Sequence, residues 1–115
     1  MFLFPHQYAA RPNRLLIACV LSLGLVACGG ESSESLVSQA KASIAKGDTQ
    51  AAVIQLKNAV AADEKNADAR YELGKLYLDQ SDLASAEKEF RRAREAGYAA
   101  STVNPMIART LLGPT

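Results

Sequence analysis

Residues that commonly carry out chemistry are scarce in this chain of 115 residues. It contains no tryptophan, one histidine (His6) and two cysteines (Cys19 and Cys28). Beyond Cys28 there is therefore no histidine or second thiol with which to build a disulfide, a Cys/His metal site or a Ser-His or Cys-His nucleophile pair. A Gly-rich phosphate loop and an HExxH-like string are also missing. These absences argue against an enzyme, and we expect no cofactor.

The charge balance also indicates no class of charged ligand. The formal net charge is +1, and no Lys/Arg cluster is longer than Arg91-Arg92. Such a chain has no basic field to attract nucleic acid. With 49% hydrophobic and 22% charged residues, the composition is that of one small globular domain. We expect neither a nucleic-acid partner nor a small-molecule substrate.

The N-terminal segment has the pattern of a targeting signal. Arg11 and Arg14 precede a mostly apolar block, 15–27. A helix needs about 20 apolar residues to cross a bilayer core, so this block is short for a permanent span. The pattern predicts a signal peptide over residues 1–27. An uncleaved membrane anchor is the alternative.

Cys28 follows Leu25, Val26 and Ala27, and this string resembles the bacterial lipobox. The resemblance implies that a diacylglycerol is attached to the thiol of Cys28, that the signal is cut just before it, and that the new amino group is acylated. Each buried CH₂ contributes about 0.8 kcal/mol, so two or more chains hold a protein on a membrane. A disulfide or a Cys-His nucleophile would need partners that the chain beyond Cys28 lacks, and the apolar block before Cys28 and the repeat beyond it favour lipid attachment over a core position.

The residues after Cys28 are polar and small, and they predict a flexible linker over residues 28–35. Gly29, rather than Asp, follows the cysteine, which by the sorting rule of enteric bacteria favours the outer membrane, facing the periplasm. The expected location is therefore the bacterial cell envelope.

The rest of the chain repeats itself at one fixed spacing. Apolar residues recur at threes and fours, with turn signals at Gly47-Asp48 and Ser81-Asp82, which predicts helices near residues 36–46, 50–62, 67–79 and 83–96. One register pairs Gly47 with Ser81 and Lys41 with Lys75. Asp48 or Thr49, Asn66 and Asp82 are expected to cap helix N-termini.

This pattern resembles the tetratricopeptide repeat, a helix-turn-helix unit of about 34 residues. The resemblance implies an all-α domain over residues 36–112, with repeats at about 33–66 and 67–100. Small residues are expected where helix backbones approach closely, with larger side chains filling the gaps between them. The packing set is Ala52, Leu56, Ala59, Leu73, Gly74, Tyr77, Ala86, Phe90 and Ala93.

A fifth helix is predicted at about residues 103–112, where Asn104-Pro105 has the form of a cap and first turn and Gly113-Pro114 that of a stop. It is either a solvating cap over the second repeat or the first helix of a further repeat.

The lipobox, the short acidic linker and the two repeats together resemble a narrower group. These are the large tetratricopeptide lipoproteins encoded beside the exosortase (PEP-CTERM) sorting and exopolysaccharide systems of Gram-negative bacteria. The similarity runs from about Leu25 to Leu112. Members of that group are much longer arrays, so a shortened or inert fragment that packs on a larger assembly is an alternative to an autonomous scaffold.

The resemblance implies a groove, lined by the first helix of each unit, that receives a protein or peptide partner. Lys41 and Lys75 hold the same place in both copies, which suggests an electropositive line; two solvated surface residues are the alternative. Tyr71 is a candidate contact residue or a shield for the neighbouring repeat. The candidate partner-binding residues are Val37, Lys41, Ile44, Tyr71, Lys75 and Leu78, accompanied by Glu34, Asp68 and Arg109.

Two more specific activities are not supported. A clamp for a C-terminal carboxylate needs Lys and Asn where this chain has Val37 and Lys41, and a second Asn where it has Glu72. Asp79 and Asp82 form the one carboxylate pair considered for catalysis, but they flank a turn and fit helix ends better.

Overall fold

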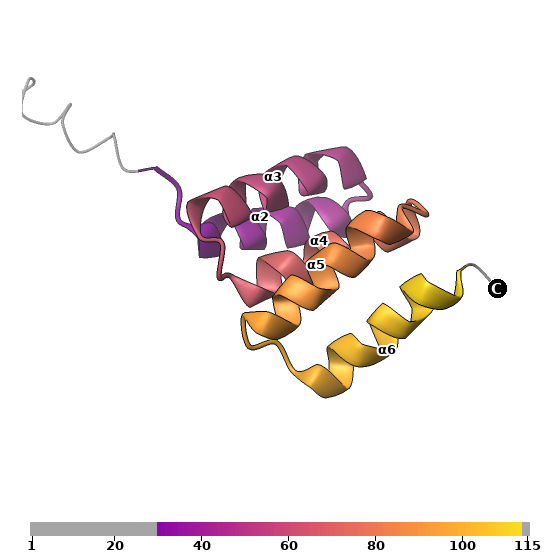
Figure 1. Cartoon of the computed structure of the whole chain (residues 1–115). Coiled ribbons are helices and arrows are strands. Elements are labelled where there is room, and N and C mark those ends of the chain that lie inside the picture. The colour runs from indigo at the N-terminus through magenta and orange to yellow at the C-terminus, as the bar shows by residue number, and fades with distance from the viewer. Residues whose placement is uncertain (1–29, 114–115) are drawn as a thin grey trace, which may run out of the picture. The chain divides into compact units, whose positions relative to one another are not determined.

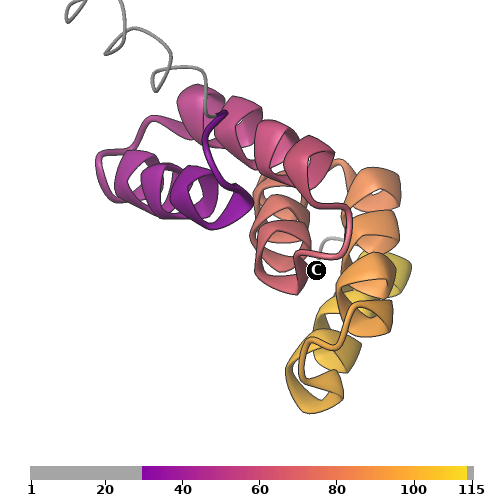
Figure 2. The same ribbon diagram turned by 90° about the vertical axis from the view of Figure 1, so that its left-hand side faces the viewer.

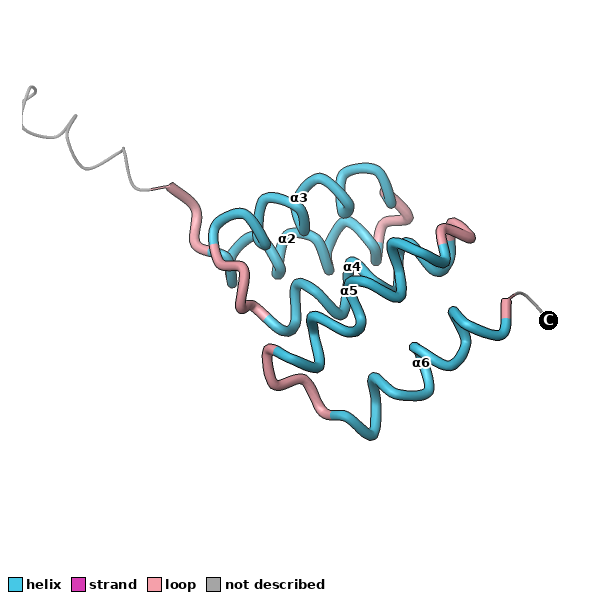
Figure 3. Tube along the Cα trace, in the orientation of Figure 1, coloured by secondary structure: helices cyan, strands magenta, loops and turns pink. Residues whose placement is uncertain are grey.

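The computed structural model describes residues 30–113, and within this range the chain consists of helices and short loops (Figure 3). The helices are α2 (Ser33–Ala45), α3 (Thr49–Ala62), α4 (Ala67–Asp79), α5 (Leu83–Glu95) and α6 (Ala100–Leu112) (Figure 1). The prediction of an all-α array with two helix-turn-helix units and one further helix is confirmed. The predicted signal peptide, lipobox and Cys28 lie outside the described residues.

The helices pack in the order of the sequence. Helix α2 pairs with α3 and α4 pairs with α5, while α3 packs on α4 and α6 packs on α5. Helix α2 also contacts α4, so the first helices of the two units are neighbours. Two views at right angles show α6 at the far end of this row from α2 (Figures 1 and 2).

Three of the four turns between the described helices share one backbone geometry. Gly47, Ser81 and Gly97 have positive φ angles of 79°, 62° and 101°. At the first, the N–H of Gly47 donates to the Ile44 carbonyl and the N–H of Asp48 to the Ser43 carbonyl, at 3.0 and 2.9 Å. The other two turns repeat both bonds. This is the Schellman ending of a helix, in which a left-handed residue satisfies the last carbonyls.

Asp48, Asn66 and Asp82 cap their helices as predicted. Each side chain accepts a hydrogen bond from the backbone N–H three residues later, of Ala51, Ala69 and Ser85 respectively. These bonds satisfy donors that the first turn of a helix leaves free. In the turns at Gly47 and Ser81 the left-handed residue is followed directly by the Asp that caps the next helix, so each turn is short.

Small residues let the helix backbones approach closely. A Cβ atom added to Gly74 would lie 2.7 Å from a ring carbon of Phe90, so α5 sits directly on the α4 backbone there. Leu73 is 3% exposed, and Tyr77 packs against the core clusters of both units. Six members of the packing set have no exposed surface: Ala52, Leu56, Ala59, Ala86, Phe90 and Ala93.

The first helix begins earlier than predicted. Helix α2 starts at Ser33 rather than at residue 36, so residues 33–35 belong to the helix and not to the linker. The hydroxyl of Ser32 accepts a hydrogen bond from the N–H of Ser35 and caps the helix, and Ser33 is buried. The predicted linker therefore extends too far into the folded part of the chain.

The last helix also begins earlier, and the interpretation of Asn104-Pro105 as its start is wrong. Helix α6 starts at Ala100, and Pro105 lies inside it. Pro105 has no N–H to donate to the Ser101 carbonyl. Both residues are exposed, so water can satisfy that carbonyl. Val103 is fully buried and holds the first turn against the second unit, which outweighs the local preference of proline for a helix start.

Gly74→Ala is expected to destabilise the protein although alanine is the better helix former. The substitution gains about 0.5–1 kcal/mol of helix propensity, whereas overpacking against Phe90 costs about 1–3 kcal/mol. Urea unfolding followed by circular dichroism measures the difference. Phe90→Leu in the same chain removes the ring from this contact, so the double variant should lose less than the two single losses added together. Strict additivity would show that the two residues do not compete for space.

Candidate functional site

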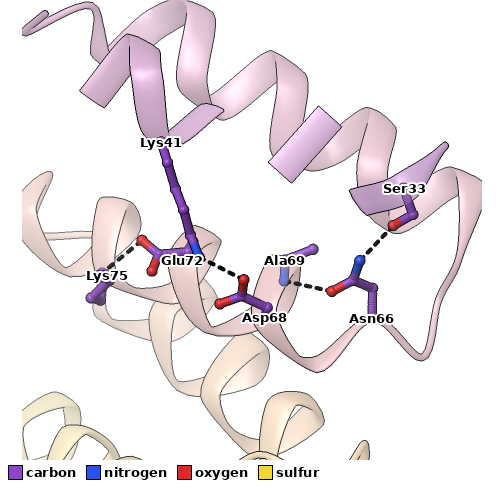
Figure 4. Close-up of polar contacts among 7 residues, drawn as sticks. All are labelled: Ser33, Lys41, Asn66, Asp68, Ala69, Glu72 and Lys75. Carbon is purple, nitrogen blue, oxygen red and sulfur yellow. Dashed lines mark hydrogen bonds and ion pairs between the residues drawn. The ribbon is translucent and has the colours of Figure 1, made fainter. Parts of the chain in front are cut away.

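The predicted groove residues lie along the first helices of the two units. Lys41 on α2 reaches across to Asp68 on α4, with 2.6 Å between Nζ and Oδ2 (Figure 4). Lys75 pairs with Glu72 on its own helix at 2.8 Å. We refer to this surface, formed by Lys41, Asp68, Glu72 and Lys75, as the helix-A face.

The helix-A face carries no electropositive line, which corrects the interpretation of the two equivalent lysines. Each ammonium group is balanced by a carboxylate of α4. The hydrogen bond to Asp68 is the main cause that raises the pKa of Lys41 above its ordinary value. Both side chains of the Lys41–Asp68 pair are nearly half exposed, so the pair contributes about 0–1 kcal/mol to stability. The helix-A face therefore presents paired charges of both signs.

Val37 is not an exposed contact residue, which corrects a second prediction. Only 4% of its surface is accessible, and it belongs to the core cluster shared by α2, α3 and α4. Val37 is one of the residues that line a depression between α2, α4 and the loop before α4. Ile44 is half-buried against the same core cluster. The depression is lined by Glu34, Val37, Ser38, Lys41, Asp63, Lys65, Asn66 and Asp68.

Tyr71 is part of an aromatic cluster. Its ring stacks on Tyr98 with 4.3 Å between centroids and 15° between planes, and it meets Phe90 at a tilt of 54°. The Lys75 ammonium lies 5.2 Å from the Tyr71 ring centroid. Burial, followed by the proximity of Tyr71, raises the pKa of Tyr98. Tyr71 thus covers the second unit with one ring face while its ring also holds a cation.

Leu78 and Arg109 meet at a second depression, between the end of α4 and the end of α6. Leu78 packs against the second core cluster, so only part of it faces the depression. Asp79, Ser81, Leu83, Leu112 and Gly113 complete the lining. Of the six predicted groove residues, Val37 and Lys41 line the first depression and Leu78 lines the second, whereas Ile44, Tyr71 and Lys75 line neither.

A buried polar joint connects the first three helices. Asn66 donates through Nδ2 to the Ser33 hydroxyl at 2.7 Å, and that hydroxyl donates to the Ala59 carbonyl at 2.8 Å (Figure 4 shows the Ser33–Asn66 bond). The other side of the Asn66 amide caps α4 at Ala69. One residue therefore begins α4 and fixes it to α2. Asn66 was predicted as a cap, but nothing in the sequence indicated Ser33 as its partner.

A buried ion pair holds α4 against α5. Arg70 and Glu89 lie 2.9 Å apart and have 6% and 9% of their side chains exposed. Arg70 also donates to the Glu64 carbonyl at 3.2 Å. Arg70 stands one repeat period after Leu36, an apolar core residue of the first unit. Because arginine is charged, the sequence did not indicate that its side chain is buried. Breaking such a pair from one side leaves an unpaired buried charge and is strongly destabilising.

Residues 30–113 include no helix that is long and apolar enough to cross a membrane. The same part of the chain contains no group of three or more His, Cys, Asp or Glu side chains placed to hold a metal ion. The helix-A face presents paired charged side chains, and the partly buried ring of Tyr71 lies next to Lys75.

Repeated helix-turn-helix units with small residues at each crossing define a helical repeat protein. The family model of the tetratricopeptide repeat matches residues 43–108, and the chain belongs to this family. Tetratricopeptide repeats generally mediate protein–protein interactions and are typically non-enzymatic scaffolds. The comparison with curated proteins found no match.

Asn66→Ala is expected to lower the free energy of unfolding by about 1–3 kcal/mol, because it removes a helix cap and one partner of the buried Ser33 hydroxyl. Asn58→Ala is the matched control, since Asn58 is exposed within α3 and alanine is the better helix former there. Thermal and urea unfolding compare the two. Equal effects of both substitutions would contradict a special role for the Ser33–Asn66 joint.

Proposed function

We propose that this protein is a lipid-anchored interaction scaffold of the bacterial cell envelope, held by Cys28 on the periplasmic face of the outer membrane. The observation that carries the proposal is the lipobox-like string Leu25-Val26-Ala27-Cys28 placed directly before a tetratricopeptide array. Helix α2 begins at Ser33, only a few positions after Cys28. An extended chain of that length spans at most about 18 Å, so the lipid would hold the array close to the membrane surface.

The partner is a protein or peptide recognised on the helix-A face. Both lysines there are paired with carboxylates, so recognition would exchange these ion pairs for others rather than fill a charged pocket. Tyr71, next to Lys75, offers a partly exposed aromatic ring that stacking on Tyr98 already holds in place. We assign the partner to the machinery of exosortase (PEP-CTERM) sorting or exopolysaccharide export, on the combined resemblance of the lipobox, linker and repeats.

A second candidate function is a passive subunit that packs on a larger assembly. It is favoured by the exposed apolar residues near the end of α6, since Leu111 and Leu112 are 62% and 81% exposed. Such a subunit would need no partner on the helix-A face.

Cys28→Ala is expected to abolish lipid labelling and release the protein from membranes. Cells producing the full chain are fed an alkyne fatty acid, and the protein is tested for label and for its distribution between membrane and soluble fractions. Cys19→Ala is the matched control, since it removes the other cysteine and should keep label and membrane association. Label that persists in Cys28→Ala, or that is lost in Cys19→Ala, would overturn the lipid assignment.

A photo-crosslinking amino acid in place of Lys41 is expected to trap a partner in cells, whereas the same amino acid in place of Lys57 should not. Both residues are exposed lysines, but Lys41 lies on the helix-A face and Lys57 on α3. The readout is a crosslinked species of defined mass that is identified by mass spectrometry. Equal crosslinking at both positions, or none at Lys41, would favour the passive subunit.

A further inference from the structure

The carboxylate of Glu72 is mostly buried although it belongs to the helix-A face. Its side chain is 11% exposed, whereas that of its ion-pair partner Lys75 is 39% exposed, with 2.8 Å between Nζ and Oε2 (Figure 4). Removing a carboxylate from water costs free energy unless a cation balances it. Glu72 therefore needs a cation beside it, and Lys75, one turn further along α4, supplies one.

Two tyrosine rings lie next to the same cation. The Lys75 ammonium is 5.2 Å from the centroid of the Tyr71 ring, and that ring stacks on Tyr98. Burial is the main cause that raises the pKa of Tyr98. Its neighbours also act on this pKa: Tyr71, Asp68 and Glu72 raise it, and Lys75 lowers it. One carboxylate and two aromatic rings thus surround a position that already holds a cation.

Lys75 holds this position weakly. Its ammonium is a compact charge on a flexible stem, and ion pairs between residues three positions apart on a helix surface contribute little. An arginine fits the same groups better, because its planar guanidinium can bond both oxygens of a carboxylate and stack on an aromatic ring. Lys75 can therefore move into water while a guanidinium takes its place.

The charge of the surrounding surface also favours an incoming cation. The helix-A face has two carboxylates and two ammonium groups. The adjoining depression shares Lys41 and Asp68 with this face and adds three charged residues, Glu34, Asp63 and Lys65. The combined surface therefore has four carboxylates and three ammonium groups. A partner that brings one cation neutralises it, whereas an anionic partner would increase the imbalance.

We propose that Glu72, Tyr71 and Tyr98 form a binding site for an arginine side chain of the protein partner, and that Lys75 fills this site when the partner is absent. The inference rests on the proposed role of the helix-A face as the partner surface, and it adds the chemistry of the partner. Lys75 acts as an internal competitor. It lowers the apparent affinity by the fraction of molecules in which it occupies the site.

The test measures binding of Nα-acetyl-arginine amide to the full chain by NMR, from changes in the backbone N–H signals of Tyr71, Glu72 and Tyr98. Lys75→Ala is expected to tighten binding by about three- to tenfold, because it removes the internal competitor. Lys57→Ala is the matched control, since Lys57 is an exposed lysine on α3 and its removal should leave binding unchanged.

Two further substitutions test the groups that form the site. In the Lys75→Ala chain, Glu72→Gln should abolish binding by removing the carboxylate charge, and Tyr71→Leu should weaken it by removing the ring. Nα-acetyl-citrulline amide, which has nearly the shape of the arginine probe without its charge, should not bind. Circular dichroism confirms that each variant keeps its helices, and substitutions at two different groups guard against a folding defect in either.

The proposal fails if Lys75→Ala does not tighten binding, if Lys57→Ala tightens it as much, or if the citrulline probe binds equally well. Self-association of the Lys75→Ala chain, seen by analytical ultracentrifugation, would assign the arginine to a second copy and overturn the assignment to a different protein. A partner trapped by crosslinking at Lys41 without any arginine binding would overturn this inference alone. Arginine binding with no trapped partner would support the site and count against the interaction scaffold.

Discussion

The contact between Phe90 and the backbone of α4 at Gly74 is the constraint on which the second half of the structure depends. The absence of a side chain at Gly74 lets the Phe90 ring lie where a Cβ atom would otherwise be. The same ring is the contact for Tyr71 and belongs to the cluster that receives Val103 and Ile107. Helix α6 thus packs on a surface that includes the Phe90 ring, and the position of that ring depends on Gly74.

The contact between the two helices of a unit is apolar in the first unit and includes a buried ion pair in the second. In the first, α2 and α3 meet through Leu36 and Leu56, and a serine hydroxyl satisfies the Ala59 carbonyl. In the second, Arg70 takes the place of Leu36, and Glu89 on α5 neutralises it. A buried ion pair is weak evidence for stability, since desolvation offsets much of the attraction. The Arg70–Glu89 pair does fix how α5 lies on α4, because a shift of either helix would leave a buried charge without its partner.

Much of the fold was predictable from the sequence because its signals are local. Asp48, Asn66 and Asp82 each cap a helix through the residue three positions later, and the repeat register places alanines at the crossings without knowledge of any tertiary contact. Pro105 shows where such signals fail. Its preference for a helix start is local, whereas the start of α6 is set by the burial of Val103 against another unit.

The helix-A face was less predictable for the same reason. Lysines at equivalent places indicate a shared position, but their net effect depends on Asp68 and Glu72, and Asp68 lies on a different helix from Lys41, far from it along the chain. Tyr71 on α4 stacks on Tyr98 in the loop before α6. Because a loop residue follows no helical period, the repeat pattern of the sequence does not indicate this contact. Periodicity identifies which side of a helix is involved, while charge balance and exposure depend on what the neighbouring helix places opposite.

The two ends of the helix row differ in the chemistry of their outer surfaces. At α2, the positions equivalent to Ala69, Leu73 and Leu76 are Ser35, Gln39 and Ala42. Gln39 donates to Glu31 at 2.7 Å, so this outer surface satisfies its polar groups locally and has the polar character of a capping surface. At α6, the outer surface presents Leu111 to solvent. The two ends of the row thus differ in chemistry, because polar groups pair with one another at the α2 end whereas an apolar side chain stays exposed to solvent at the α6 end.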